Sequence, residues 1–290
     1  MIIDTFLFNK DFNALRIRLA ELYDVVDLFV ISESQYTFTG KRKNLFLTEN
    51  MDEFEQYSNK IKIVVNTKNY RTSNPWVRDH RQRQLISKYL KSFKLGINDL
   101  IIHSDCDEIP RSTIIRSLRD TKKSQNILLE LINCHNYINL TNGTWKRGRI
   151  VTGDIYKSIN KMTLDIFLYN NLDFRRHRFP FYRVPEYATN LYYYLWKFPK
   201  IVFKKPNLQL IKNAGWHFNN LFSFEDIIDK IQDSSHVELN TNEVLTKAKE
   251  RHSKGLEIYS GAPYILQELD NTYPKFILEN LSDWSEFILD

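Results

Sequence analysis

The stretch that decides the fold reads LIIHSDCDEIP and spans residues 100–110. Its apolar first half predicts a buried strand, and Asp105 and Asp107 follow directly after that strand. In α/β folds, ligands bind at the carboxyl edge of a parallel sheet. Alternate residues of an extended segment share a face, so the two carboxylates can point the same way. The stretch therefore predicts an α/β protein with an acidic ligand site at one edge of its sheet.

Strand and helix patterns alternate on the N-terminal side of this stretch. Apolar runs predict strands at 2–8, 25–32, 60–66 and 99–104, and helical periodicity predicts helices at 13–22 and 78–93. This β-α-β-α-β order predicts a mostly parallel sheet flanked by helices. Farther along, we expect a helix at 112–119, strands at 127–138 and 149–156, and helices from Ser223 and at 242–255. No composition shift marks a second domain, so residues 1–290 are expected to form a single domain.

Composition excludes several classes of protein. The chain has 290 residues, of which 42% are hydrophobic and 26% charged, and this balance is typical of a globular protein rather than a disordered one. Its net charge of +6 suits anionic ligands such as nucleotides and phosphates without choosing among them. Cys106 and Cys134 are the only cysteines, and their spacing indicates neither a disulfide framework nor a zinc site. Two buried thiols in a reducing compartment are expected.

The sequence shows no membrane segment. No stretch approaches the roughly 18 uncharged apolar residues that a bilayer-spanning helix needs. The apolar run at 2–8 lacks the basic leader of a signal peptide. We therefore expect a cytoplasmic protein, in a bacterial cell or in the cytosol of a virus-infected host.

The acids of the 105–108 loop predict a metal site. Asp105, Asp107 and Glu108 repel one another unless a cation or hydrogen-bond donors compensate their charges. Hard oxygen ligands select Mg²⁺ or Mn²⁺, which keep positions open for substrate phosphates. A D-x-D tripeptide arises about once by chance in such a sequence, so its place after a buried strand carries the hypothesis. The alternative is an exposed acidic turn at the N-terminus of the next helix, where negative charge is favourable.

The same loop resembles a known family. D-C-D-E-I-P at 105–110 is similar to the D-x-D-E-I-P block of glycosyltransferase family 17, the family of the bisecting GlcNAc-transferases (β-1,4-mannosyl-glycoprotein 4-β-N-acetylglucosaminyltransferases). The resemblance covers residues 2–110 closely and 186–240 more loosely. Further blocks follow in the family's order: D-T-F-L-F at 4–8, E-L-Y-D-V-V-D at 21–27, I-S-E-S at 31–34, T-F-T-G at 37–40, W-V-R-D at 76–79 with Asp79 in place of glutamate, Gln82-Arg83, G-W-H-F at 215–218, Lys230 and Ser235-His236.

This resemblance implies both a fold and an activity. The implied fold is of the GT-A type, with a Rossmann-like nucleotide-sugar-binding half at 1–110 and an acceptor-binding half at 111–290 of one catalytic domain. The implied reaction is an inverting transfer of a sugar, expected to be GlcNAc from UDP-GlcNAc, to a carbohydrate acceptor, with Mn²⁺ or Mg²⁺ as cofactor. Animal members carry an N-terminal membrane anchor, which this sequence does not show. That difference favours a bacterial or viral relative acting on a glycan other than the vertebrate N-glycan core.

The resemblance also assigns expected roles to the metal-site residues. Asp107 is the first choice as a metal ligand, and Asp105 is expected at the ribose or at a metal-bound water. His217 is expected as a further metal ligand or as a diphosphate contact. The alternative for His217 is a packed, hydrogen-bonded residue.

Other candidates surround this site. Thr5, Phe6 and Glu33 end the first two strands, where uracil and ribose are expected, although Phe6 also fits the core. Arg78 and Arg83 are candidates for the diphosphate because guanidinium groups suit phosphate oxygens, with a salt bridge to Asp79 or Glu108 as the alternative. An inverting transfer also needs a carboxylate base. The sequence leaves the base open among Glu108, Glu186, Asp226 and Glu238. Trp196, Trp216 and the tyrosines at 192–194 are candidates to stack on sugar rings or to pack in the core.

Two other functions stay as alternatives. A sugar-1-phosphate nucleotidyltransferase also uses acidic loops, but it begins with a Gly-rich phosphate loop, and the first glycine here is Gly40. A basic nucleic-acid-binding protein needs clustered Lys and Arg, and R-R-H-R at 175–178 is the only compact cluster. We therefore expect a nucleotide-sugar donor and a glycan acceptor as partners, and no nucleic acid.

Overall fold

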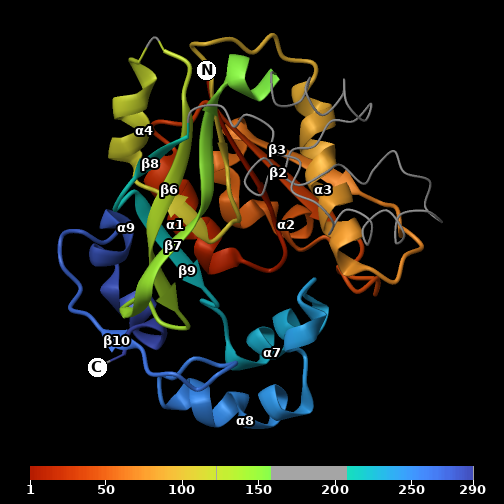
Figure 1. Ribbon diagram of the computed structural model, residues 1–290, viewed down its shortest axis with the longest axis vertical. Coiled ribbons are helices and arrows are strands. Elements are labelled where there is room, and N and C mark those ends of the chain that lie inside the picture. The colour runs from red at the N-terminus through yellow and green to blue at the C-terminus, as the bar shows by residue number, and fades with distance from the viewer. Residues whose placement is uncertain (122, 158–207, 290) are drawn as a thin grey trace.

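The computed structural model describes residues 1–121, 123–157 and 208–289. Within these ranges ten strands form one sheet (Figure 1): β1 (Ile2–Leu7), β2 (Leu28–Ser34), β3 (Ile61–Asn66), β4 (Leu100–His103), β5 (Glu108–Pro110), β6 (Asn126–His135), β7 (Leu140–Thr152), β8 (Gln209–Ile211), β9 (Gly215–Asn219) and β10 (Ile265–Leu266). The α-helices are α1 (Phe12–Leu22), α2 (Phe46–Glu49), α3 (Pro75–Leu90), α4 (Ser112–Arg119), α7 (Phe224–Asp233), α8 (Asn242–Ser253) and α9 (Lys275–Leu278). The described residues also contain three 3-10 segments: η1 (Met51–Lys60), η3 (Val237–Leu239) and η4 (Leu281–Phe287).

The sheet is parallel in its first part and mixed beyond it. Its strand order is β3-β2-β1-β4-β7-β6-β9-β5, with β10 on β7 and β8 on β6. Strands β3, β2, β1 and β4 are parallel, whereas β7 is antiparallel to both β4 and β6. A turn of four residues, 136–139, joins β6 to β7, and so short a connection requires antiparallel strands. The predicted α/β class is confirmed, and the predicted mostly parallel sheet is confirmed only for the N-terminal strands.

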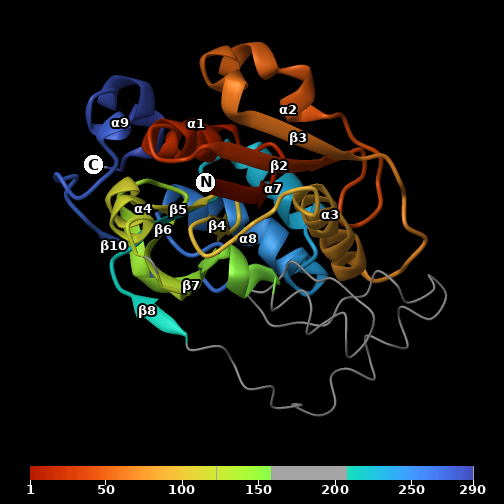
Figure 2. The same ribbon diagram turned by 90° about the horizontal axis from the view of Figure 1, so that it is seen from above.

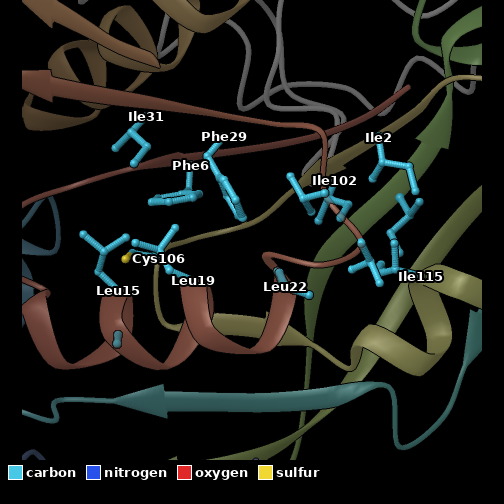
Figure 3. Packing of buried hydrophobic residues seen from close by; sticks show 14 of the residues in the cluster. Ile2, Phe6, Leu15, Leu19, Leu22, Phe29, Ile31, Ile102, Cys106 and Ile115 are labelled. Carbon is cyan, nitrogen blue, oxygen red and sulfur yellow. The ribbon is translucent and has the colours of Figure 1, made fainter. Parts of the chain in front are cut away.

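Helices cover both faces of the sheet, and the alternate residues of β1 pack against helices on opposite faces. Its alternate residues Ile2 and Phe6 pack with α1, while Ile3 and Leu7 pack on the opposite face with α3. Figure 3 shows the first of these layers, in which leucines of α1 lie under the strands. The view from above shows α1 and α3 on opposite sides of the strands (Figure 2). This alternation is the two-residue period of a strand buried on both faces.

Two further layers come from the C-terminal part of the chain. Helix α9 and segment η4 pack against the outer side of α1 through a cluster that includes Trp216 and Trp284. Helices α7 and α8 have a small apolar core of their own, made by residues such as Ile227 and Val244. Ser223 caps α7, since its hydroxyl accepts from the Asp226 backbone N–H, as the sequence predicts. No helix in the part of the chain that the structure describes combines the length and apolar composition of a membrane span.

All predicted strands and helices before residue 120 are present, and their ends differ from the predicted ends by at most three residues. The predicted strand at 127–138 ends at His135, and the one at 149–156 belongs to β7, which begins at Leu140 and ends at Thr152. Strands β5, β8 and β10 have only two or three residues each, too few to give a sequence pattern, and they were missed. The five-residue strand β9 was missed as well. The basic cluster at 175–178 lies outside the described residues.

We expect Gly215→Ala to destabilise the protein by about 3 kcal/mol, because strand β9 approaches β5 closely at this position. A Cβ on Gly215 would lie 2.0 Å from the carbonyl oxygen of Ile109. Thermal unfolding followed by circular dichroism measures the loss, as a midpoint lowered by roughly 10 °C. Gly96→Ala is the matched control, since its new methyl group meets only Asp99 at 3.8 Å. Equal midpoints for the two variants would contradict this reading of the β5–β9 contact.

Candidate functional site

A buried arginine fixes the backbone of the acidic loop. Arg18 of α1 is fully buried, and its Nε and Nη2 donate to the two carboxylate oxygens of Asp4 at 2.7 and 2.6 Å. Its Nη1 donates to the carbonyl oxygens of Asp105 at 2.9 Å and Glu108 at 2.8 Å, and Nη2 also donates to the Ser104 hydroxyl at 2.7 Å. Burial alone would lower the pKa of Arg18, but the charge of Asp4 outweighs it and raises that pKa. One guanidinium thereby connects β1, α1 and the loop.

The side chains of Asp105 and Glu108 accept hydrogen bonds from different partners. Asp105 Oδ1 accepts from Arg83 Nη2 at 2.8 Å, while Arg83 Nε donates to Asp79 at 2.6 Å. Glu108 accepts from the Asp105 backbone N–H at 2.9 Å and from the Trp145 indole N–H at 2.7 Å. Both oxygens of the Glu108 carboxylate are therefore engaged within the protein.

Strand register brings His217 to the loop. In β9, His217 lies opposite Glu108 of β5 and Asn133 of β6. Its Nε2 is 3.7 Å from Asp107 Oδ1, and its Nδ1 is 2.8 Å from the Asn133 side-chain oxygen. Trp145 stacks on the imidazole with ring centroids 4.6 Å apart. An amide oxygen only accepts, so Nδ1 carries the hydrogen and Nε2 is the nitrogen that faces Asp107; in a neutral ring, Nε2 would present its lone pair there.

This pair fits a divalent cation. Two ligand atoms that are each about 2.1 Å from one ion are at most about 4.2 Å apart, which accommodates the observed 3.7 Å. Two lone-pair groups that face each other are compensated by a cation between them. Among the described residues, no three His, Cys, Asp or Glu side chains converge as a complete metal-binding group. Water and substrate phosphates would therefore complete the coordination of such an ion.

Lys230, which the family resemblance names without a role, and Asp11, which the sequence left unassigned, both lie near Asp107. Lys230 of α7 has its ammonium 3.5 Å from Asp107 Oδ2 and 3.7 Å from Asp11 Oδ1. Burial would lower the pKa of Lys230, but the charges of Asp11 and Asp107 raise it. Burial raises the pKa of Asp11 to about 6, and the charge of Asp107 contributes to the rise. Asp11 follows β1 directly, so its position at the carboxyl edge of the sheet was a signal in the sequence.

A cavity of about 130 Å³ opens beside this cluster. The loops that follow β1 and β2 and helix α7 enclose it. Burial lowers the pKa of Lys43 to about 8, which indicates an ammonium with little water around it. The lining consists of two phenylalanines, three lysines, three aspartates and one asparagine: Phe46, Phe222, Lys10, Lys43, Lys230, Asp226, Asp229, Asp233 and Asn9.

Comparison with known families identifies what kind of site this is. The sequence model of glycosyltransferase family 17 matches residues 1–145, which is half of the chain and contains the whole acidic loop. The chain belongs to glycosyltransferase family 17. Membership makes this protein an enzyme that transfers sugars. Together with the parallel order of β3, β2, β1 and β4, it confirms the predicted fold class, α/β of the GT-A type.

Solved structures give more distant likenesses. The crystal structure of GalNAc-T7 with UDP, GalNAc and Mn²⁺ matches at 14% identity and a TM-score of 0.30, over 46% of this chain and 23% of that one. HddC from Yersinia pseudotuberculosis matches at 11% identity and a TM-score of 0.36, over 73% of this chain and 90% of that one. Neither likeness is close enough to inform the function. No protein with a curated description matches the chain significantly.

Three predicted nucleotide contacts of this glycosyltransferase lie inside the protein. The Thr5 hydroxyl donates to the Ile102 carbonyl, Phe6 packs under Arg18, and Glu33 accepts from the backbone N–H groups that begin α2. All three side chains have no exposed surface with which to contact uracil or ribose. The loops that follow them in the sequence line the cavity instead.

The remaining predicted residues are spread more widely. Arg78 donates to the Phe38 carbonyl at 3.2 Å, beneath Gly40. Asp226 lines the cavity and pairs with Lys10 at 3.0 Å, whereas Glu238 is an exposed residue paired with His236. Trp216 is buried in the core, with the Arg111 guanidinium 4.1 Å from its ring centroid. Glu186, Trp196 and the tyrosines at 192–194 lie outside the described residues.

We expect Arg18→Met to lower the free energy of unfolding by roughly 3–5 kcal/mol, because it leaves the buried Asp4 carboxylate without its partner. Urea unfolding measures this loss. Arg16→Met on the same helix is the control: its partner Glu53 and Arg16 itself are both exposed, so we expect a change below about 1 kcal/mol. Similar losses in the two variants would show that the Asp4–Arg18 pair does not hold the loop.

Proposed function

We propose that this glycosyltransferase is metal-dependent and inverting, and that it transfers GlcNAc from UDP-GlcNAc to a carbohydrate acceptor. The observation that carries the proposal is the position of the Asp107–His217 pair beside a lysine-lined cavity. That cavity lies at the carboxyl ends of β1 and β2, where α/β folds bind nucleotides.

Asp107 and His217 are the residues that would hold Mn²⁺ or Mg²⁺. When bound, the cation would neutralise the negative charge that develops on the departing diphosphate. Asn133 and Trp145 fix the imidazole from its other edge and from its face, so His217 is oriented before any ligand arrives. Asp105, which Arg83 holds, is the proposed contact for the ribose or for a metal-bound water.

The lysines of the cavity support a diphosphate-binding role. Lys10 and Lys230 are balanced by neighbouring aspartates, whereas Lys43 donates to the Asn44 carbonyl at 3.3 Å and its ammonium is 4.9 Å from the Phe46 ring centroid. A poorly hydrated ammonium is stabilised by an anion that enters beside it. The site therefore favours a ligand that brings phosphate oxygens.

We propose fewer candidates for the catalytic base than the sequence alone left open. Glu108 is buried and both of its oxygens are engaged, so it supports the loop rather than accepting a proton from an acceptor. Asp226 stays a candidate because it lines the cavity. Glu238 and Glu186 also stay predictions, the first exposed and the second outside the described residues.

Asp107→Asn should lower kcat for sugar transfer by a factor on the order of 10³, because it removes a charged metal ligand at the point where leaving-group charge develops. A panel of UDP-sugars with Mn²⁺, with Mg²⁺ and with EDTA measures both the donor and the metal requirement. UDP-GlcNAc should be the preferred donor, and EDTA should abolish turnover.

Asp270→Asn provides the control, since Asp270 is exposed and its side chain accepts from nearby Thr272. It should keep wild-type activity. Full activity of Asp107→Asn, or full activity of the wild type in EDTA, would refute the metal assignment, and preference for another UDP-sugar would refute the GlcNAc assignment.

The binding of UDP should weaken as pH rises from 7 to 9, because the pKa of Lys43 is lowered to about 8 by burial. Below that pH the ammonium is charged and attracts the diphosphate, and above it the amine is neutral. Lys43→Met should bind UDP roughly tenfold to a hundredfold more weakly at pH 7, which corresponds to one charge-assisted hydrogen bond. Calorimetric titration of UDP with Mg²⁺ present measures both effects.

The control for this titration is Lys41→Met, since Lys41 is exposed and pairs with Asp233 at the rim. The Lys41 variant should keep the pH dependence of the wild type, and the Lys43 variant should lose most of it. An identical pH profile in the Lys43 variant would exclude Lys43 from the diphosphate site.

A further inference from the structure

A row of aromatic rings leads away from Asp107 Oδ1, the carboxylate oxygen that faces His217. Trp145 stacks on His217 with centroids 4.6 Å apart and planes at 21°. His135 meets the edge of His217 at 6.3 Å, and Tyr264 stacks on His135 at 4.9 Å and 14°. These four rings come from β7, β9, β6 and the residue just before β10, so four separate segments build the row.

The inner rings of the row are held rigidly. His217 is bonded to Asn133, and His135 Nδ1 lies 3.2 Å from the Asn219 side-chain nitrogen. The outer rings, Trp145 and Tyr264, are only half-buried and present part of their surface to solvent.

The row and the cavity differ in the ligand chemistry they favour. None of the four rings lines the cavity, where three lysines converge. The two ends of the row differ in charge. The Arg147 guanidinium lies 5.5 Å from the Trp145 ring centroid, whereas the acid Glu257 lies in a loop closed by the Leu256–Pro263 bridge, directly before Tyr264. Flat aromatic faces beside an acceptor oxygen suit the C–H face and the hydroxyl groups of a neutral pyranose, and they do not suit a phosphate.

Asp107 lies between the two places. Its Oδ2 faces Lys230 of the cavity at 3.5 Å, and its Oδ1 faces His217 of the row at 3.7 Å. A ligand in the cavity and a sugar on the row would therefore meet at this carboxylate. Such a meeting is the geometry that transfer between two bound substrates requires.

We propose that the ring row Trp145–His217–His135–Tyr264 is the acceptor platform, and that Tyr264 stacks on a neutral pyranose of the acceptor glycan. This inference rests on the proposed transfer function and adds the residues that select the acceptor. Tyr264 then acts on acceptor binding and leaves the donor and the metal untouched.

The test replaces the ring of Tyr264 while keeping its bulk. Tyr264→Leu removes the aromatic face, Tyr264→Phe keeps it, and Leu266→Ala removes exposed apolar surface two residues farther along without touching a ring. Methyl pyranosides of mannose, galactose, glucose and GlcNAc serve as acceptor probes with UDP-GlcNAc and Mn²⁺. Thermal unfolding of each variant checks that it is folded.

We expect the KM for the accepted methyl pyranoside to rise roughly tenfold in Tyr264→Leu, in line with the loss of one stacking contact. Hydrolysis of UDP-GlcNAc without acceptor should stay within twofold of the wild type. Tyr264→Phe and Leu266→Ala should keep the wild-type KM. An acceptor KM in Tyr264→Leu equal to that in Leu266→Ala would overturn the platform while leaving the transfer function intact.

A binding measurement separates the platform from the proposed function. Saturation-transfer NMR detects contact between the methyl pyranosides and the protein without any turnover. If no UDP-sugar is hydrolysed or transferred by the wild type, the proposed function fails, and sugar signals that weaken in Tyr264→Leu still support the platform. Signals that are absent in the wild type, or equal in the wild type and Tyr264→Leu, overturn it.

Discussion

The buried ion pair between Asp4 and Arg18 ties the first strand and the first helix to the acidic loop. Both side chains have no exposed surface, so removing them from water costs several kcal/mol per ion before their attraction is counted. That cost is offset by two short contacts to Asp4 and by the carbonyl and hydroxyl oxygens of the loop that Arg18 also satisfies. The pair therefore matters less as a source of stability than as a fixed support for the loop. The backbone on either side of Asp107 is held before any ligand binds.

Because the loop is held rigidly, the carboxylate of Asp107 faces two groups of residues that differ in chemistry. On one side of Asp107 lie Lys230 and the lysine-lined cavity, which favour phosphate oxygens. On the other side lie His217 and the aromatic row, which favour a cation ligand set and a neutral sugar. Arg83 pairs with Asp105 at 2.8 Å, so the two aspartates of the loop have different partners. In the proposed function the donor lies on the cavity side of Asp107 and the acceptor on the side of the aromatic row.

Local sequence was sufficient for much of the fold. The strands and helices before residue 120 follow from apolar periodicity, because strands buried on both faces and amphipathic helices leave strong patterns. The position of Asp105 and Asp107 after β4 also follows from this order. The short strands β5 and β9 left no pattern, and neither did Arg18, since a charged residue on a helix normally predicts an exposed face. Thr5, Phe6 and Glu33, which the sequence offers as nucleotide contacts, are fully buried, and the loops that follow them line the cavity.

The sequence by itself determined the fold class, the family and the loop on which the chemistry depends, because each is written in consecutive residues. Only the tertiary structure decided which distant residues join that loop. His217 reaches Asp107 because β9 lies between β6 and β5 in one particular register, and a shift of one residue would turn the imidazole to the opposite face. Lys230 and Tyr264 come to their places through packing of segments more than 120 residues away from the loop in sequence, and pairings at such separations leave no trace in local periodicity.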